Sequence, residues 1–132
     1  MMAAVGGDLP PVVRDWFDAR VWRPRRHQIE MLAAARAGRN ALLVAPTGAG
    51  KTLAGFLSSL VELIERPTKG LHTLYVSPLK ALAVDVQRNL LTPIAEMDLD
   101  IRVETRTGDT PADRKARQRV KPPQMLLTTP ES

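Results

Sequence analysis

The 132-residue sequence contains no cysteine and only two histidines, His27 and His72. The absence of cysteine excludes disulfides and thiolate metal sites. The two histidines lie far apart in the sequence, and no cluster of carboxylates accompanies either one. We therefore expect no metal site that is built from protein ligands alone.

Long apolar runs are also lacking. The longest apolar segments fall well short of the roughly 20 residues that a transmembrane helix requires. Residues 1–8 do not combine a basic segment with an apolar core, as a secretory signal would. These features predict a cytoplasmic protein with no membrane partner.

The composition is that of an ordinary globular protein, with 44% hydrophobic and 25% charged residues. A chain of 132 residues is expected to form one domain or part of one. Its net charge of +5 and isoelectric point near 10.2 suit an anionic partner such as nucleic acid or a nucleotide. Many cytoplasmic proteins are mildly basic without such a partner, so the charge alone does not decide.

One segment carries a specific chemistry. Residues 45–52 read Ala-Pro-Thr-Gly-Ala-Gly-Lys-Thr and follow the apolar run 41–44. In a phosphate-binding loop between a strand and a helix, backbone N–H groups and the helix N-terminus hold a polyphosphate, the lysine reaches the β- and γ-phosphates, and the hydroxyl binds Mg²⁺. The general pattern begins with glycine, whereas this chain has Ala45 at that position. The alternative to a phosphate-binding loop is a glycine-rich turn that caps the helix and binds nothing. The predicted phosphate-binding residues are Pro46, Thr47, Gly48, Ala49, Gly50, Lys51 and Thr52.

The rest of the chain alternates between strand-like and helix-like patterns. Short apolar or alternating runs predict strands over 41–44, 73–76, 101–105 and 125–129. Apolar residues at helical spacing predict helices over about 11–17, 24–37, 51–64, 81–91 and 113–120. Pro93 is expected to break or kink the fourth helix, and Asp113 to cap the fifth. Strands separated by helices predict an α/β fold, with a parallel sheet and helices on both faces.

Four further segments lie just before the phosphate-binding loop or directly after a predicted strand. Segment 24–28 contains Gln28, which stands twenty-three positions before Lys51. The other three segments are residues 77–82, 106–110 and 128–132, which follow the second, third and fourth strands. Ligands of parallel sheets bind at the carboxyl edge of the strands, so these segments are expected to share one site.

The order, spacing and strand context of these motifs resemble the first motor domain of superfamily 2 helicases. Within that superfamily the chain is similar to the DExH helicases of the large helicase-related group, and most similar to the bacterial ligase-associated DEXH-box DNA helicases. The resemblance runs from about residue 22 to residue 132. It implies that residues 22–132 form the N-terminal part of an incomplete RecA-like P-loop NTPase domain, truncated before the Asp-Glu motif. Residues 1–21 would then be an N-terminal extension that contains a helix.

The resemblance also implies roles around the nucleotide, with ATP and Mg²⁺ as cofactors. Lys51 and Thr52 would be catalytic, and Thr52 would contact Mg²⁺ through the bound ATP. Gln28 would recognise the adenine edge, because a side-chain amide both donates and accepts hydrogen bonds. Trp22 would stack on the base and Arg25 would also contact the nucleotide. The alternatives are a solvated helix residue for Gln28 and core packing for Trp22.

A second set of residues would bind the nucleic-acid strand, by the same resemblance. Lysine offers a point charge to phosphate, and hydroxyls and backbone N–H groups hydrogen-bond it, so such contacts hold the backbone without reading bases. The segment 107–110 could instead be an ordinary turn, and the basic run 114–119 either contacts nucleic acid or is only solvated. The predicted nucleic-acid-binding residues are Pro78, Lys80, Thr107, Gly108, Asp109, Thr129 and Pro130.

The function that the resemblance implies is that of an ATP-dependent DNA helicase or translocase, moving 3′ to 5′ and acting in DNA repair. Its partner would be single-stranded DNA or a duplex with a single-stranded tail, and a DNA ligase or nuclease could accompany it. The residues 77–82 depart from the form found in DEAD-box RNA helicases, although the chain could still belong to an RNA helicase. It could also be a non-catalytic binding module or a different P-loop enzyme. Because the Asp-Glu pair of the family is absent, we expect this chain alone to be inactive.

Overall fold

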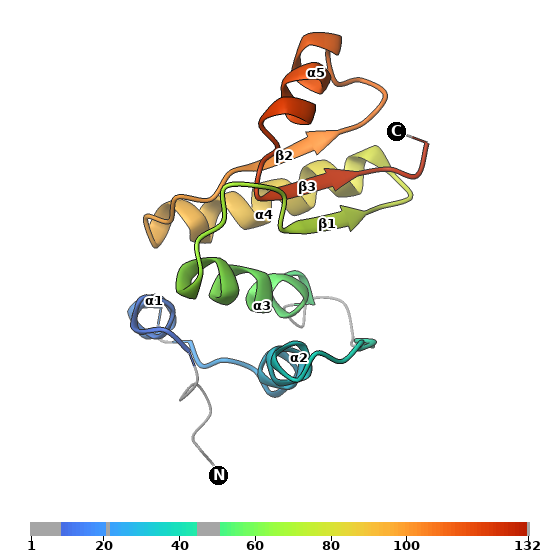
Figure 1. Cartoon of the computed structure of the whole chain (residues 1–132). Coiled ribbons are helices and arrows are strands. Elements are labelled where there is room, and N and C mark those ends of the chain that lie inside the picture. Colours follow the sequence, from blue (N-terminus) through green and yellow to red (C-terminus); the bar gives the residue numbers. More distant parts are fainter. Residues whose placement is uncertain (1–8, 21, 45–50, 132) are drawn as a thin grey trace. The chain divides into compact units, whose positions relative to one another are not determined.

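The computed structural model describes residues 9–20, 22–44 and 51–131. The chain divides into two compact units, residues 1–65 and 66–132, and each is described by itself (Figure 1). Within the described residues, no helix is long and apolar enough to cross a membrane.

The first unit is helical. Pro11 occupies the first turn of α1 (Pro11–Ala19), where a missing N–H costs no helical hydrogen bond. The helix α2 (Arg26–Arg36) ends before Gly38, whose φ of +71° is a left-handed conformation that glycine adopts without strain. The long helix α3 (Lys51–Glu65) packs against α2, as its apolar stripe predicts. The stripe is almost completely buried at Leu57, Leu60 and Val61.

The predicted strand over residues 41–44 is wrong. These residues are irregular in the structure, and Leu42 and Val44 are 88% and 84% exposed. An extended segment is stable in a sheet only when its N–H and C=O groups pair with a neighbouring strand. Among the described residues the segment has no strand partner, so its apolar side chains stay uncovered.

The second unit is built around a parallel sheet, as predicted. Its three strands lie in the order β1-β3-β2, so the last strand in the sequence is central. The strands end in register, because Thr128 of β3 pairs with Val76 of β1 and with Arg106 of β2. The strands are β1 (Thr73–Val76), β2 (Val103–Arg106) and β3 (Met125–Thr128).

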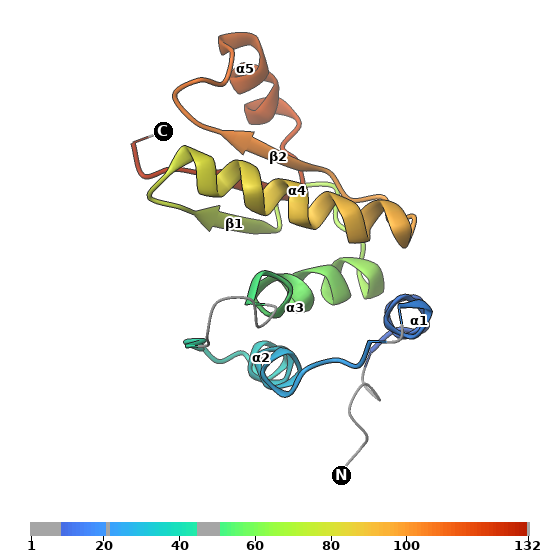
Figure 2. The ribbon, with the colours of Figure 1, turned by 180° about the vertical axis from the view of Figure 1, so that it is seen from behind.

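The helix α4 (Lys80–Glu96) covers one face of this sheet (Figure 2). It buries Ala83, Leu90 and Ile94, and the Gln87 side chain donates a hydrogen bond to the Val103 carbonyl at 3.0 Å. Pro93 was expected to break or kink this helix, and a break at Pro93 is wrong, because the helix continues to residue 96. Burial of Pro93 and of the residues around it offsets the lost backbone hydrogen bond.

The helix α5 (Ala112–Val120) is joined to β2 by polar contacts rather than by an apolar face. Gln118 is 5% exposed, and its amide nitrogen donates to the Glu104 carboxylate at 3.0 Å and to the Thr105 carbonyl at 3.2 Å. Arg106 donates to the Gln118 side chain at 3.3 Å. The predicted cap is displaced: Pro111 is the N-cap, and Asp113 lies inside the first helical turn.

Candidate nucleotide and nucleic-acid site

The predicted phosphate-binding loop falls largely outside the described residues. This applies to Pro46, Thr47, Gly48, Ala49 and Gly50. Their neighbours Lys51 and Thr52 are the first two residues of α3, and Thr52 is half-buried. A helix of 15 residues that begins at this point presents N–H groups and the positive end of its dipole where the loop would hold phosphates.

Gln28 is a buried residue that caps the first turn of α2. It is 3% exposed, which excludes the alternative of a solvated helix residue. The Gln28 side-chain oxygen accepts a hydrogen bond from the Arg25 backbone N–H at 2.8 Å, and the Gln28 backbone N–H donates to the Arg25 carbonyl at 3.0 Å. This cap fixes the position of the amide group, whereas the Arg25 side chain is exposed.

Replacing this glutamine should destabilise the first unit. We expect Gln28→Ala to lower the free energy of unfolding by about 0.5–2 kcal/mol, because the Arg25 N–H loses its acceptor. Urea unfolding followed by circular dichroism measures the change. The control is Glu30→Ala on the same helix, where the exposed ion pair with Arg26 at 3.5 Å is worth at most about 1 kcal/mol. Equal losses in the two variants would contradict a capping role for Gln28.

Trp22 has features of both of its predicted roles, core packing and stacking on a base. Its ring packs edge-on against Trp16, with the ring centroids 5.7 Å apart, yet the residue remains 53% exposed. The Arg20 guanidinium lies 4.5 Å from the centroid of Trp16 and 5.9 Å from that of Trp22. One side of the Trp22 ring is thus held by the protein, while enough surface stays exposed for stacking against a base.

Within the second unit, the predicted nucleic-acid-binding residues lie at and just after the carboxyl edge of the sheet. Because the three strands end in register, the residue directly after each one reaches the same edge. These three residues are all hydroxylated and buried: Ser77 (0% exposed), Thr107 (6%) and Thr129 (2%). Two of them were predicted to contact nucleic acid, whereas Ser77 was not.

The buried hydroxyls shape the loops that follow the strands. The Leu79 N–H donates to Ser77 Oγ at 3.3 Å, at the start of α4. The Asp109 N–H donates to Thr107 Oγ1 at 3.2 Å, and the Thr107 N–H donates to Thr110 Oγ1 at 2.9 Å. The segment 107–110 is therefore a side-chain-stabilised turn, as one interpretation of its sequence had it.

The exposed members of the site stand on these loops. Pro78, Gly108 and Pro130 are exposed and contribute backbone surface. Lys80, the first residue of α4, lies with its amino group 3.0 Å from the carboxylate of Asp109, which follows β2. The fold thus brings two of the predicted nucleic-acid-binding residues, twenty-nine positions apart in the sequence, into direct contact.

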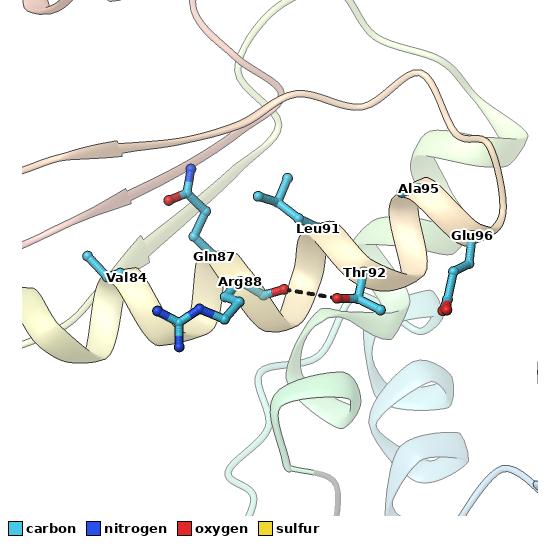
Figure 3. Close-up of a pocket in the computed structure, with 7 residues that line it drawn as sticks. All are labelled: Val84, Gln87, Arg88, Leu91, Thr92, Ala95 and Glu96. Atoms are coloured by element: carbon cyan, nitrogen blue, oxygen red, sulfur yellow. Dashed lines mark hydrogen bonds between the residues drawn. The ribbon is translucent and has the colours of Figure 1, made fainter.

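A groove of about 560 Å³ lies along α4 (Figure 3). It combines apolar Val84 and Leu91 with charged Arg88 and Glu96, and none of its lining residues belongs to the predicted set. The described residues also contain no group of three histidine or acidic side chains that could hold a metal ion. The predicted ligand contacts of the second unit therefore lie after the strands and at the first residue of α4, and none of them lines this groove.

Residues 25–132 match the DEAD/DEAH box helicase family. The chain is 41% identical to the Lhr helicase/probable uracil glycosylase of Mycolicibacterium smegmatis, over 96% of this chain and 9% of that protein. It is 40% identical to the ATP-dependent helicase Lhr-Core of Methanocaldococcus jannaschii, over 94% of this chain and 16% of that protein. The chain thus spans between 9% and 16% of the lengths of these curated relatives.

Solved structures show the same likeness. The Mycobacterium smegmatis helicase Lhr bound to ssDNA and AMP-PNP matches 98% of this chain and 18% of its own, with a TM-score of 0.87 and 41% identity. The DUF1998 helicase MrfA bound to DNA and AMPPNP matches 93% of this chain and 17% of its own, with a TM-score of 0.84 and 28% identity. Both agree with the RecA-like α/β class that the sequence predicts.

Proposed function

Because this chain belongs to the DEAD/DEAH box helicase family, we propose that it is the nucleotide-binding and strand-binding part of an ATP-dependent DNA helicase or translocase. Residues 22–132 would be the first part of the RecA-like motor domain, and residues 1–21 an extension. The observation that carries the proposal is the sheet edge at which three parallel strands end in register. That edge gathers Lys80, the 107–110 turn and Thr129 on neighbouring loops.

The donors around the start of α3 fit a nucleotide. The proposed phosphate contacts are the loop 46–50, the Lys51 ammonium and the N-terminus of α3, which are all suited to negative charge. Thr52 would supply a hydroxyl for Mg²⁺, and Gln28 and Trp22 would bind the base. The relative Lhr was solved with AMP-PNP, which supports ATP as the nucleotide here. When bound, ATP would supply the free energy of hydrolysis.

The strand-binding edge is proposed to hold the nucleic-acid backbone rather than to read bases. Lys80 offers the one positive charge among the predicted contacts, and the turns at 77–79 and 107–110 present backbone groups held in place by buried hydroxyls. A motor that steps along any sequence requires contacts of this kind. DNA is proposed as the track because structures of the relatives Lhr and MrfA were solved with DNA.

Several finer points rest on the family resemblance alone. We propose 3′ to 5′ movement, a role in DNA repair, a cytoplasmic location, and a ligase or nuclease as a companion protein. The longer protein would supply the residues that complete hydrolysis, and this chain alone would then bind ligands without turnover.

Two titrations of the 132-residue chain test this proposal. We expect a fluorescent ATP analogue with Mg²⁺, and a labelled single-stranded oligothymidylate, each to bind saturably, with weaker DNA binding as salt rises. An oligouridylate of equal length tests the track, and tighter RNA binding would favour an RNA helicase. If the chain bound neither the nucleotide nor either strand, the proposed function would be wrong.

A further inference from the structure

The exposed ion pair between Lys80 and Asp109 joins two loops of the proposed strand-binding edge. Lys80 begins α4, directly after β1, and Asp109 belongs to the turn after β2. Their amino and carboxylate groups are 3.0 Å apart, and the side chains are 52% and 80% exposed. The contact is therefore open to solvent and to any polyanion that approaches this edge.

Both partners are held in place by their own loops. The start of α4 is fixed by Ser77, whose N–H donates to the Thr128 carbonyl at 2.9 Å and whose hydroxyl accepts from the Leu79 N–H. Asp109 is fixed by the hydrogen bond from its N–H to Thr107 Oγ1 at 3.2 Å. The carboxylate thus stands beside the lysine without a rearrangement of either loop.

A carboxylate beside this lysine has a consequence for strand binding. Lys80 has been given the role of a phosphate contact, yet its ammonium group already pairs with a carboxylate of the same chain. A phosphate group presents the same chemistry as a carboxylate, with negative oxygens that accept hydrogen bonds from an ammonium group. A second anion at the same position would be repelled by Asp109, so the phosphate and the carboxylate compete.

We propose that Asp109 is a positioning residue that occupies Lys80 in the absence of nucleic acid, and that a backbone phosphate binds Lys80 in exchange for this carboxylate. The inference rests on the proposed strand-binding function and adds to it a carboxylate that competes with phosphate for Lys80. Asp109 holds the lysine at the sheet edge before binding and lowers its affinity for any one phosphate. Weak contacts of this kind suit a protein that must release one phosphate before it binds the next.

The test is a set of salt titrations with fluorescein-labelled single-stranded oligothymidylate and the 132-residue chain. Asp109→Asn should tighten DNA binding by about two- to fivefold at low salt, the range expected for an exposed ion pair. It should also steepen the dependence of log affinity on log salt by up to about 0.7, because a phosphate on an unpaired lysine releases one more counterion. Both side chains are exposed, so the variant should keep the circular dichroism spectrum of the parent chain.

Two further variants separate the inference from general electrostatics. Asp85→Asn removes the same charge from α4 and frees Arg88 from a 3.5 Å ion pair, but it lies outside the predicted strand-binding residues. We expect its effect on affinity to be smaller than that of Asp109→Asn. In a Lys80→Gln background, Asp109→Asn should lose most of its effect, because the two changes act on one contact.

The outcomes of these titrations distinguish a failure of this inference from a failure of the proposed strand-binding function. Unchanged or weaker binding by Asp109→Asn would overturn the inference alone, provided that the parent chain binds DNA. The same holds if the gain persists without Lys80 or equals the gain of Asp85→Asn. If neither the parent nor any variant binds DNA, the proposed function and the inference both fall.

Discussion

Lys51→Ala should lower the affinity of the chain for ATP by roughly 10- to 150-fold, since a hydrogen bond to a charged group contributes about 1.5–3 kcal/mol. Lys51 follows the glycine-rich loop and begins α3, the position from which the lysine of a phosphate-binding loop reaches the β- and γ-phosphates. Neutral alanine leaves the phosphate charge balanced only by backbone groups and Mg²⁺. Titration of a fluorescent ATP analogue in the presence of Mg²⁺ measures the loss.

Lys69→Ala is the matched control for this prediction. It removes the same charge from an exposed residue in the loop before β1, which is not one of the predicted nucleotide contacts. We expect it to leave ATP affinity within about twofold of the parent, because an exposed charge that does not contact the nucleotide is screened by salt. In a longer enzyme that contains this chain, Lys51→Ala should also abolish ATP hydrolysis. Undiminished binding or turnover by Lys51→Ala would remove the phosphate-binding role from the loop.

The sequence predicted the helicase family and most of the fold because these depend on local patterns. The strand–loop–helix motif and its companion segments identified the family, which is confirmed by the match over residues 25–132. Apolar spacing placed α3 and β1 with almost correct bounds, since an amphipathic stripe must be buried against a neighbour. The roles of individual site residues stay predictions.

Patterns failed where the outcome depends on partners elsewhere in the chain. The run 41–44 has the composition of a buried strand, but a strand also requires a paired neighbour, and the described residues supply none. Pro93 was expected to break or kink a helix, but α4 is not broken there and continues to residue 96, with Leu90, Pro93 and Ile94 buried. Local sequence contains neither kind of information.

The polar contacts of the site were likewise beyond sequence reasoning. Spacing identified Gln28 but not the cap it forms with Arg25, because capping depends on where the helix begins. No pattern could pair Lys80 with Asp109, which meet only because β1 and β2 flank the same central strand. The parallel topology therefore supplies contacts whose members are unrelated in sequence.

The second large prediction concerns Leu127, which lies in the same central strand. Leu127 is 0% exposed in β3, between the two outer strands. Leu127→Ala should lower the free energy of unfolding of the second unit by about 2–5 kcal/mol, the cost of lost burial and of the cavity that remains. Urea unfolding of the chain followed by circular dichroism measures this change.

Leu74→Ala is the control, because it makes the same substitution in β1, where the residue is 57% exposed. We expect it to cost less than about 1 kcal/mol, since little apolar surface is withdrawn from water there. Leu127→Ala should also weaken DNA binding, because Thr129 directly follows β3. The loops after β1 and β2 also depend on the register in which those strands pair with β3. Equal stability losses in the two variants would show that β3 is not the structural centre of the strand-binding edge.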